Sequence, residues 1–124
     1  MERVEIQVVT LPVADADRAK EFYAGRLGWH VDHDQVVTPE LRFVQVTPPN
    51  SACSITFGQG LSTMAPGSLH ALMAVIDDAD AALAELRAAG VDAQGVDEQP
   101  WGRFVTFADP DGNSWTLQQL PVRG

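Results

Sequence analysis

The chain has 124 residues, with 17 Asp and Glu against 8 Lys and Arg, which gives a formal net charge of −9. This length suits one compact domain, and a hydrophobic fraction of 45% with 20% charged residues excludes a disordered chain. An acidic surface repels phosphate backbones and anionic lipids, so the composition argues against nucleic-acid and membrane-surface partners.

The first half of the chain predicts a strand, a helix and three further strands. A β-branched run from Val4 to Leu11 forms the first strand. Asp15 lies where an N-cap is needed and Gly28 where a helix ends, and the apolar spacing between them predicts one buried helical stripe. The following strands are expected at about 29–35, 41–47 and 52–58.

The second half predicts the same order of elements after a linker at 59–67. A strand from Leu69 to Ile76 precedes a helix that is capped by Asp78 and ended by Gly90. Three strands follow at about 91–97, 103–108 and 114–120, and Asp109-Pro-Asp-Gly-Asn113 forms a turn between the last two.

The two halves are diverged copies of one unit. Val13–Asp17 aligns with Ile76–Asp80, and two strand segments align in the same order: Arg42–Val46 with Arg103–Phe107, and Ser54–Gln59 with Ser114–Gln119. The sequence therefore predicts an α+β fold of two tandem βαβββ modules in a single domain, 1–124. Module one is expected at 1–58, the linker at 59–67 and module two at 68–124.

Period-two alternation assigns the side chains of the later strands to two faces. One phase is apolar and should pack under the helices: Val44, Val46, Ile55, Phe57, Val105, Phe107, Trp115 and Leu117. The other phase mixes aromatic and polar side chains: Phe43, Gln45, Ser54, Thr56, Phe104, Thr106, Ser114, Thr116 and Gln118. This mixture suits the wall of a ligand cleft, and a solvated face or a dimer interface is the alternative.

The motifs resemble those of the vicinal oxygen chelate superfamily, which contains glyoxalase I, bleomycin-resistance proteins and extradiol dioxygenases. The resemblance rests on Val13–Tyr23, Leu27–Trp29, Val75–Ala82, Gly90–Val91 and Asp109–Asn113, in that order along nearly the whole chain. It implies an eight-stranded fold with an open cleft and a homodimer. The group includes isomerases, dioxygenases, thiol transferases and drug-sequestering proteins, so the resemblance does not fix one activity.

The resemblance also implies where a metal would be held, by one residue on each of four strands. The matching positions here are Val8, Thr56, Ala71 and Thr116, whose side chains are hydrocarbons or neutral hydroxyls and poor ligands. We therefore expect no metal, no cofactor and no catalytic residue. The alternative is a register shift through a β-bulge, which would turn Gln7 and His70 inward as two ligands.

Other candidate groups carry weaker signals. His30 and His33 are expected on opposite faces of one strand, whereas His30, Asp32 and Asp34 share a face and form either a ligand set or, as we favour, a solvated edge. Cys53 is expected to be a buried structural thiol, and with one cysteine and no signal segment the sequence predicts a cytoplasmic protein.

The favoured function is binding of a small cationic or aromatic molecule by a homodimer. The expected substrate-binding residues are Phe43, Gln45, Thr56, Trp101, Phe104, Thr106, Thr116 and Gln118, with the Trp101 ring stacking on a flat ligand. Trp29 has two interpretations, at the cleft mouth or in helix packing. The alternatives are a metal-dependent lyase, isomerase or dioxygenase with non-standard ligands such as His70, and a scaffold subunit that only dimerises.

Overall fold

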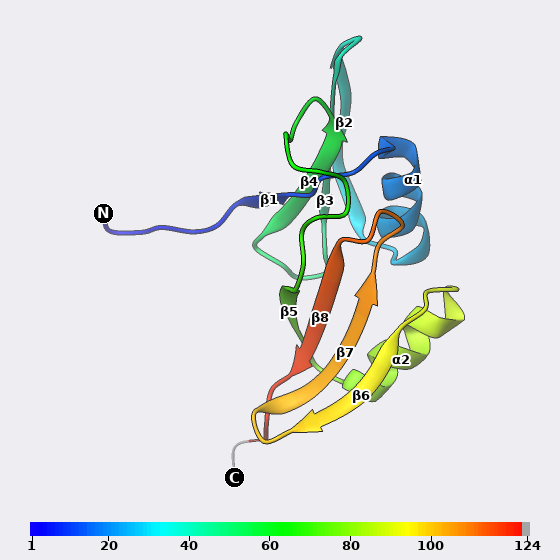
Figure 1. Ribbon diagram of the computed structural model, residues 1–124. Helices are drawn as coiled ribbons and strands as arrows, with labels where there is room; N and C mark the ends of the chain where they lie inside the picture. Colours follow the sequence, from blue (N-terminus) through cyan, green and yellow to red (C-terminus); the bar gives the residue numbers. More distant parts are fainter. Residues whose placement is uncertain (123–124) are drawn as a thin grey trace.

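The computed structural model describes residues 1–122 and contains two four-stranded mixed sheets, each covered by a helix on one face (Figure 1). The first sheet has the strand order β1-β4-β3-β2 and the second has the order β5-β8-β7-β6. In both sheets the first strand runs parallel to the last, and the other neighbours are antiparallel. The predicted α+β fold of two βαβββ modules is confirmed.

The elements follow the predicted order with adjusted bounds. The first module contains β1 Val8–Thr10, α1 Ala16–Lys20, the π-helix η1 Glu21–Arg26, β2 His30–Thr38, β3 Leu41–Thr47 and β4 Ser54–Gln59. The second contains β5 Leu72–Ile76, α2 Ala79–Ala88, β6 Gln94–Gln99, β7 Gly102–Ala108 and β8 Ser114–Gln119.

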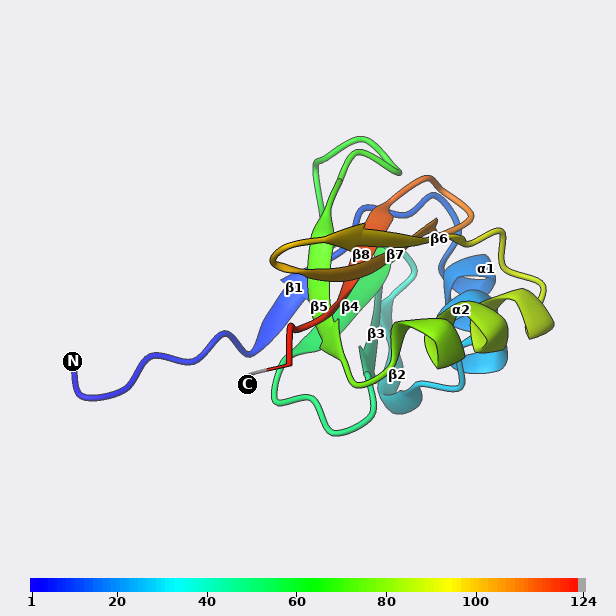
Figure 2. The ribbon, with the colours of Figure 1, turned by 90° about the horizontal axis from the view of Figure 1, so that it is seen from below.

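The first strand is shorter than predicted. It begins at Val8 and not at Val4, and residues 1–7 extend away from the body of the molecule (Figure 2). Its partner β4 begins only at Ser54, whose N–H donates to the Gln7 carbonyl at 2.8 Å, so earlier residues lie beyond the end of the neighbouring strand. The exposed side chains of Val4 and Ile6 leave this segment without a core to join.

Both helices begin and end at the predicted residues. The Asp15 carboxylate accepts from the Asp17 and Arg18 N–H groups, and Asp78 accepts from Ala81 N–H. Gly28 and Gly90 take positive φ angles of 73° and 80°, which favour glycine. The first helix has one more residue between its cap and its glycine, and the π-helical turn η1 accommodates that extra residue.

The apolar phase of the strands forms the core, as predicted. All eight of its side chains are buried, and they join the helix residues Ala19, Phe22, Tyr23 and Leu86 in one cluster that spans both modules. Phe22 contacts Phe107 with ring centroids 6.2 Å apart, so aromatic packing continues from the first helix to the second sheet. Trp29 packs against Tyr23 and Trp115, which matches the helix-packing interpretation of this residue.

A buried polar network holds the two modules together. The Tyr23 hydroxyl donates to Asp109 Oδ2 at 2.8 Å and accepts from Trp115 Nε1 at 3.0 Å. Asn113 Nδ2 donates to Asp109 Oδ2 and to the Pro12 carbonyl, both at 2.9 Å. Burial, reinforced by the Asp109 carboxylate, raises the pKa of Tyr23 far above its usual range. The Asp109–Asn113 turn is therefore a clasp on the first module as well as a connection between strands.

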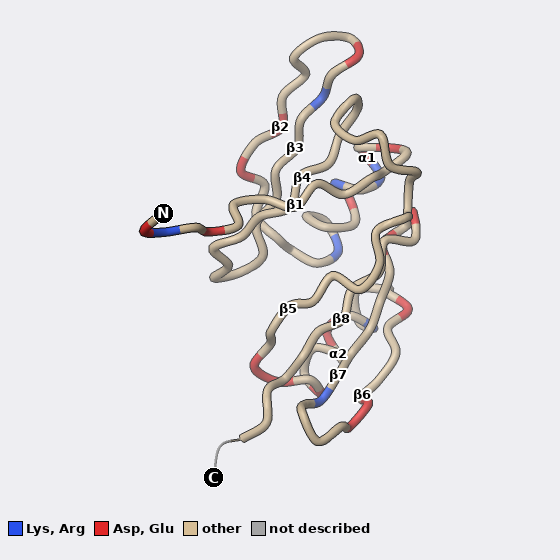
Figure 3. Tube along the Cα trace, turned by 60° about the vertical axis from the view of Figure 1, so that its left-hand side comes forward, with Lys and Arg blue, Asp and Glu red and all other residues tan. Residues whose placement is uncertain are grey.

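An ion group recurs at the same place in each module. Arg42 donates to Asp17 at 2.7 Å and to Asp34 at 3.0 Å, while Arg103 donates to Asp80 at 2.8 Å and to Glu98 at 2.9 Å. Each guanidinium ties the first turn of a helix to an outer strand. Figure 3 shows that the acidic residues are spread over helix starts, strand edges and turns of both modules.

The helices bear on the expected compartment, and the surroundings of Cys53 bear on the expected state of its thiol. None of the helices within residues 1–122 has the length and apolar character needed to cross a membrane. Cys53 is a free thiol that is half-buried, and so less enclosed than predicted, because it lies in the short connection that precedes β4. The cytoplasmic location remains a prediction.

Candidate functional site

The face of each sheet opposite its helix carries the predicted ligand-contacting residues. In the first sheet Gln45 pairs with Thr56 across β3 and β4, and Phe43 lies on the same face two residues before Gln45. Thr56 is only 2% exposed, and its hydroxyl lies 2.9 Å from that of Thr10. Thr56 is therefore buried on this face, whereas Phe43 and Gln45 are half-buried and more accessible to solvent.

The second sheet presents the matching half of the set. Phe104 pairs with Gln118 and Thr106 with Thr116 across β7 and β8. Gln118 Nε2 donates to the Trp101 carbonyl at 3.0 Å and so fixes the turn between β6 and β7. Trp101 is 60% exposed on this turn. Register thus groups three predicted residues on one sheet and five on or beside the other.

His33 joins the first of these faces, which corrects a sequence-based expectation. Register shifts by one residue between Val31 and His33, so that His30 pairs with Thr47 and His33 with Gln45. The bulge puts both histidines on the face of Gln45, not on opposite faces. The His33 ring lies 6.4 Å from that of Phe43. Sequence alternation missed His33 because no local signal marks the bulge.

The same bulge separates the acidic residues of this strand. Thr47 donates its hydroxyl hydrogen to Asp32, which lies 3.8 Å from His30, whereas Asp34 pairs with Val44 on the helix face. Hydrogen bonds from Arg42 and then Lys20 lower the pKa of Asp34 to about 2. The grouping of His30, Asp32 and Asp34 on one face was therefore wrong, and Asp34 belongs to the ion group of the first module.

The four positions at which the resemblance would put a metal lie on the strands as follows. Val8 pairs with Ser54 and thus shares the face of Thr56, and Thr116 pairs with Met73 on the second sheet. Ala71 lies just before β5 with a φ of 60°. Gln7 and His70, the alternative pair, are both exposed. Within residues 1–122, no three His, Cys, Asp or Glu residues are grouped as a metal site would require.

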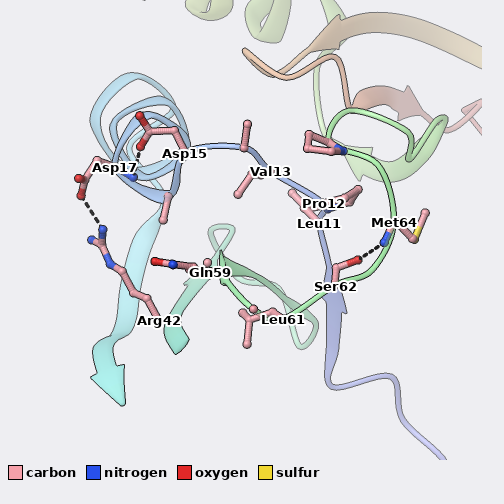
Figure 4. Close-up of a pocket in the computed structure, with 15 residues that line it drawn as sticks. Leu11, Pro12, Val13, Asp15, Asp17, Arg42, Gln59, Leu61, Ser62 and Met64 are labelled. Atoms are coloured by element: carbon pink, nitrogen blue, oxygen red, sulfur yellow. Dashed lines mark hydrogen bonds and ion pairs between the residues drawn. The ribbon is translucent and has the colours of Figure 1, made fainter. Parts of the chain in front are cut away.

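Two pockets of about 590 Å³ lie elsewhere on the molecule. The linker pocket, shown in Figure 4, is formed by residues 11–17, Arg42 and residues 58–66, without Thr63 and Ala65. The Asp17–Arg42 ion pair lies at one end of it, and Met64 and Pro12 lie at the other. The inter-module pocket lies between α2 and the first module. None of the eight predicted ligand-contacting residues lines either pocket.

The fold and the polar sheet faces define a class of protein, a two-module α+β protein with a helix-free face on each sheet. Comparison with known proteins shows the family. The model of the Glyoxalase/Bleomycin resistance protein/Dioxygenase superfamily matches residues 5–117, and the chain belongs to this superfamily.

Solved structures extend the comparison. The chain resembles TnmS3, an antibiotic binding protein from Streptomyces sp. CB03234, with 37% identity and a TM-score of 0.88, covering 98% of this chain and 99% of that one. It resembles a glyoxalase/bleomycin resistance protein from the same organism, with 37% identity and a TM-score of 0.82 over 93% of this chain and 100% of that one.

A curated relative comes from another bacterium. The chain is 26% identical to the uncharacterized protein YetH of Bacillus subtilis, with 93% of this chain and 98% of that protein covered. The similarity spans both modules in each comparison, so the two-module arrangement as a whole is shared.

Proposed function

We propose that this protein binds and sequesters a small molecule with a flat aromatic or cationic part, on the helix-free faces of its two sheets, without catalysing a reaction on it. The observation that carries the proposal is the register. It gathers Phe43 and Gln45 on one face and Phe104, Thr106, Thr116 and Gln118 on the other, as aromatic and hydrogen-bonding walls. The likeness to an antibiotic binding protein at 37% identity supports the same class of ligand.

Trp101 is the proposed stacking residue. Its ring is largely exposed, on a turn that the Gln118 amide holds by a hydrogen bond to the Trp101 carbonyl. A large, flat and partly solvated ring gains contact area when a planar ligand stacks on it. The net charge of −9 favours the approach of a cation.

A homodimer would complete the site. Each sheet face in one chain is a single wall, and exposed apolar side chains lie along the edges that end in β1 and β5. They are Val4 and Ile6 before β1, and Met73 and Val75 on β5. We propose that these edges meet in the dimer and bring the first face of one copy beside the second face of the other, because edge strands offer unpaired backbone groups to a second chain.

The proposed site works without a metal. Val8 and Ala71 have no lone pair to offer, and Thr56 already shares its hydroxyl with Thr10. Elemental analysis of protein purified without chelator should find far less than one divalent metal ion per chain. About one iron, zinc or nickel ion per chain would overturn the metal-free proposal, and loss of that metal in His70→Ala would identify His70 as a ligand.

Ligand binding is tested with two probes, bleomycin and the planar aromatic cation ethidium. Each should bind the wild-type protein with a change in tryptophan fluorescence or a heat signal. Trp101→Ala should weaken binding about tenfold, while Trp101→Phe, which keeps a flat ring, should retain most of it. Failure of both probes to bind, or equal affinity in Trp101→Ala, would contradict the proposed site.

The dimer is tested by sedimentation. Wild-type protein at tens of micromolar should sediment as a dimer, and Met73→Glu with Val75→Glu should shift it to the monomer. Val36→Glu and Val37→Glu are the matched control, because these side chains are equally exposed but lie near the β2–β3 turn. A monomeric wild-type protein would refute the dimer. If the β5 variant stays dimeric and the control variant becomes a monomer, the choice of edge is refuted.

A further inference from the structure

The inter-module pocket is a cavity with an apolar base and an acidic rim. The base is formed by Phe107 and Leu117 of the second sheet and by Trp29 of the first module, and α2 contributes Ala82 and Leu86. Its volume of about 590 Å³ lies in the range of about 300–1,000 Å³ that small-molecule sites occupy. None of the eight predicted ligand-contacting residues lines it, although Val75 of the proposed dimer edge does.

The two helices differ in the side chains that they carry at this distance from their caps. In the first helix, Phe22 and Tyr23 lie seven and eight residues after the cap Asp15 and are 4% and 0% exposed. The residues at the same distance from the cap in α2 are Glu85 and Leu86. Counted from the caps, Phe22 is thus matched by Glu85, an exposed carboxylate that lines the pocket.

The charges at the rim favour a cation. Asp77, Asp78 and Glu85 line the pocket, together with one basic residue, Arg26. Arg26 is already engaged, because its Nε lies 3.5 Å from Glu21 and its Nη1 donates to the Gly90 carbonyl at 3.3 Å. The rim therefore carries an excess of negative charge beside the half-buried ring of Trp29.

We propose that the inter-module pocket is a second binding site, for a small organic cation with an aromatic or branched aliphatic body. The body lies against Trp29, Phe107 and Leu117, and the positive charge lies near Asp77 and Glu85. Dispersion and apolar burial hold the body, and the carboxylates select the charge. This ligand class follows from the pocket lining alone and does not depend on the proposed function of the sheet faces.

Benzyltrimethylammonium is the probe, and neopentylbenzene is its neutral isostere. We expect calorimetry to show binding of the cation to the wild-type protein, with at least tenfold weaker binding of the neutral compound and clear weakening at high salt. The double variant Asp77→Asn and Glu85→Gln should bind the cation at least threefold more weakly than the wild-type protein does. Glu40→Gln, an exposed carboxylate that lines neither pocket, is the control and should change nothing.

A second variant tests the cavity itself. Glu85→Phe puts a large ring at a position that lines the pocket and should fill it, so that binding falls more than tenfold while the fold is kept. If this variant does not fold, the charge variants still decide the outcome. Equal affinity in the charge variants, or no binding by the wild-type protein, overturns the site. If Trp101→Ala abolishes binding of the probe and Glu85→Phe keeps wild-type affinity, the probe binds at the sheet faces. That result would overturn the inter-module site and leave the proposed function standing.

Discussion

Removal of one hydroxyl group from the inter-module network should weaken the whole fold. Tyr23→Phe deletes the acceptor of Trp115 Nε1 and one donor of Asp109, while Asp109 keeps Asn113 Nδ2 and its backbone N–H donors. An unpaired buried N–H costs about 1–3 kcal/mol, and a lost hydrogen bond to a charged group costs about 1.5 kcal/mol or more. We therefore expect a loss of about 2–4 kcal/mol in the free energy of unfolding, measured by urea denaturation with circular dichroism.

A double-mutant cycle identifies the cause of that loss. In a Trp115→Phe background the indole donor is already absent, so Tyr23→Phe should cost about 1 kcal/mol less than it does in the wild type. An equal cost in both backgrounds, or a loss below about 0.5 kcal/mol in the wild type, would refute this assignment of the network.

Burial of the Tyr23 hydroxyl also predicts how the stability of the fold depends on pH. The chain has one tyrosine, so the absorbance change that accompanies tyrosine ionisation reports Tyr23 alone. Because the folded-state pKa of Tyr23 is raised above the unfolded value of about 10, the stabilising effect of the neutral hydroxyl is complete below that pH and is lost as the pH rises above it. Tyrosinate absorbance should therefore appear only together with unfolding, and a reversible titration near pH 10 in folded protein would contradict the burial.

Two further predictions concern the ion group and the glycines. Asp34→Asn should lower the free energy of unfolding by about 1–2 kcal/mol at neutral pH, since Arg42 and Lys20 lower the pKa of Asp34 to about 2, below its unfolded value of about 3.9. The difference from wild type should shrink as the pH falls below about 4 towards 2, and a difference that is independent of pH would refute the ion-pair origin. Gly67→Ala should cost about 3 kcal/mol or more, against about 1 kcal/mol for Gly28→Ala. Both glycines have positive φ, but a Cβ at Gly67 would lie 1.9 Å from the Asp111 carbonyl oxygen and one at Gly28 meets nothing within 4 Å; equal losses in urea denaturation would contradict this reasoning.

Local patterns in the sequence predicted the parts of the fold that depend on local physics. The Asp15 and Asp78 caps and the Gly28 and Gly90 ends follow from backbone groups within one turn. Strand alternation assigned the buried phase correctly because both sheets bury one face under a helix. Because the two halves of the sequence align, the order of elements predicted for one half supported the same order in the other.

Features that depend on neighbouring strands were missed. The bulge in β2 between Val31 and His33 reversed the expected faces of His33 and Asp34. Strict alternation cannot predict such an extra residue. The first strand was predicted too long because Val4 and Ile6 favour a strand but find no neighbour within their own chain. The inter-module pocket arises from contacts between the two halves, which a single pattern along the chain does not describe.

The assignment of the candidate site divides in the same way. Register grouped Gln45 with Thr56 and Phe104 with Gln118, so the faces predicted for these side chains are confirmed. Their contact with a ligand stays a prediction, because alternation gives the direction of a side chain but not what it touches.

The clasp at Asp109–Asn113 also constrains the order in which the polypeptide folds. Its contacts join residues far apart in sequence, with a separation of 101 between Asn113 and Pro12 and of 86 between Asp109 and Tyr23. Such distant contacts slow folding, because chain entropy is lost before the contact is gained. We therefore expect that, during synthesis, the Tyr23 hydroxyl gains its buried partners only after Asp109 and Trp115 have been made.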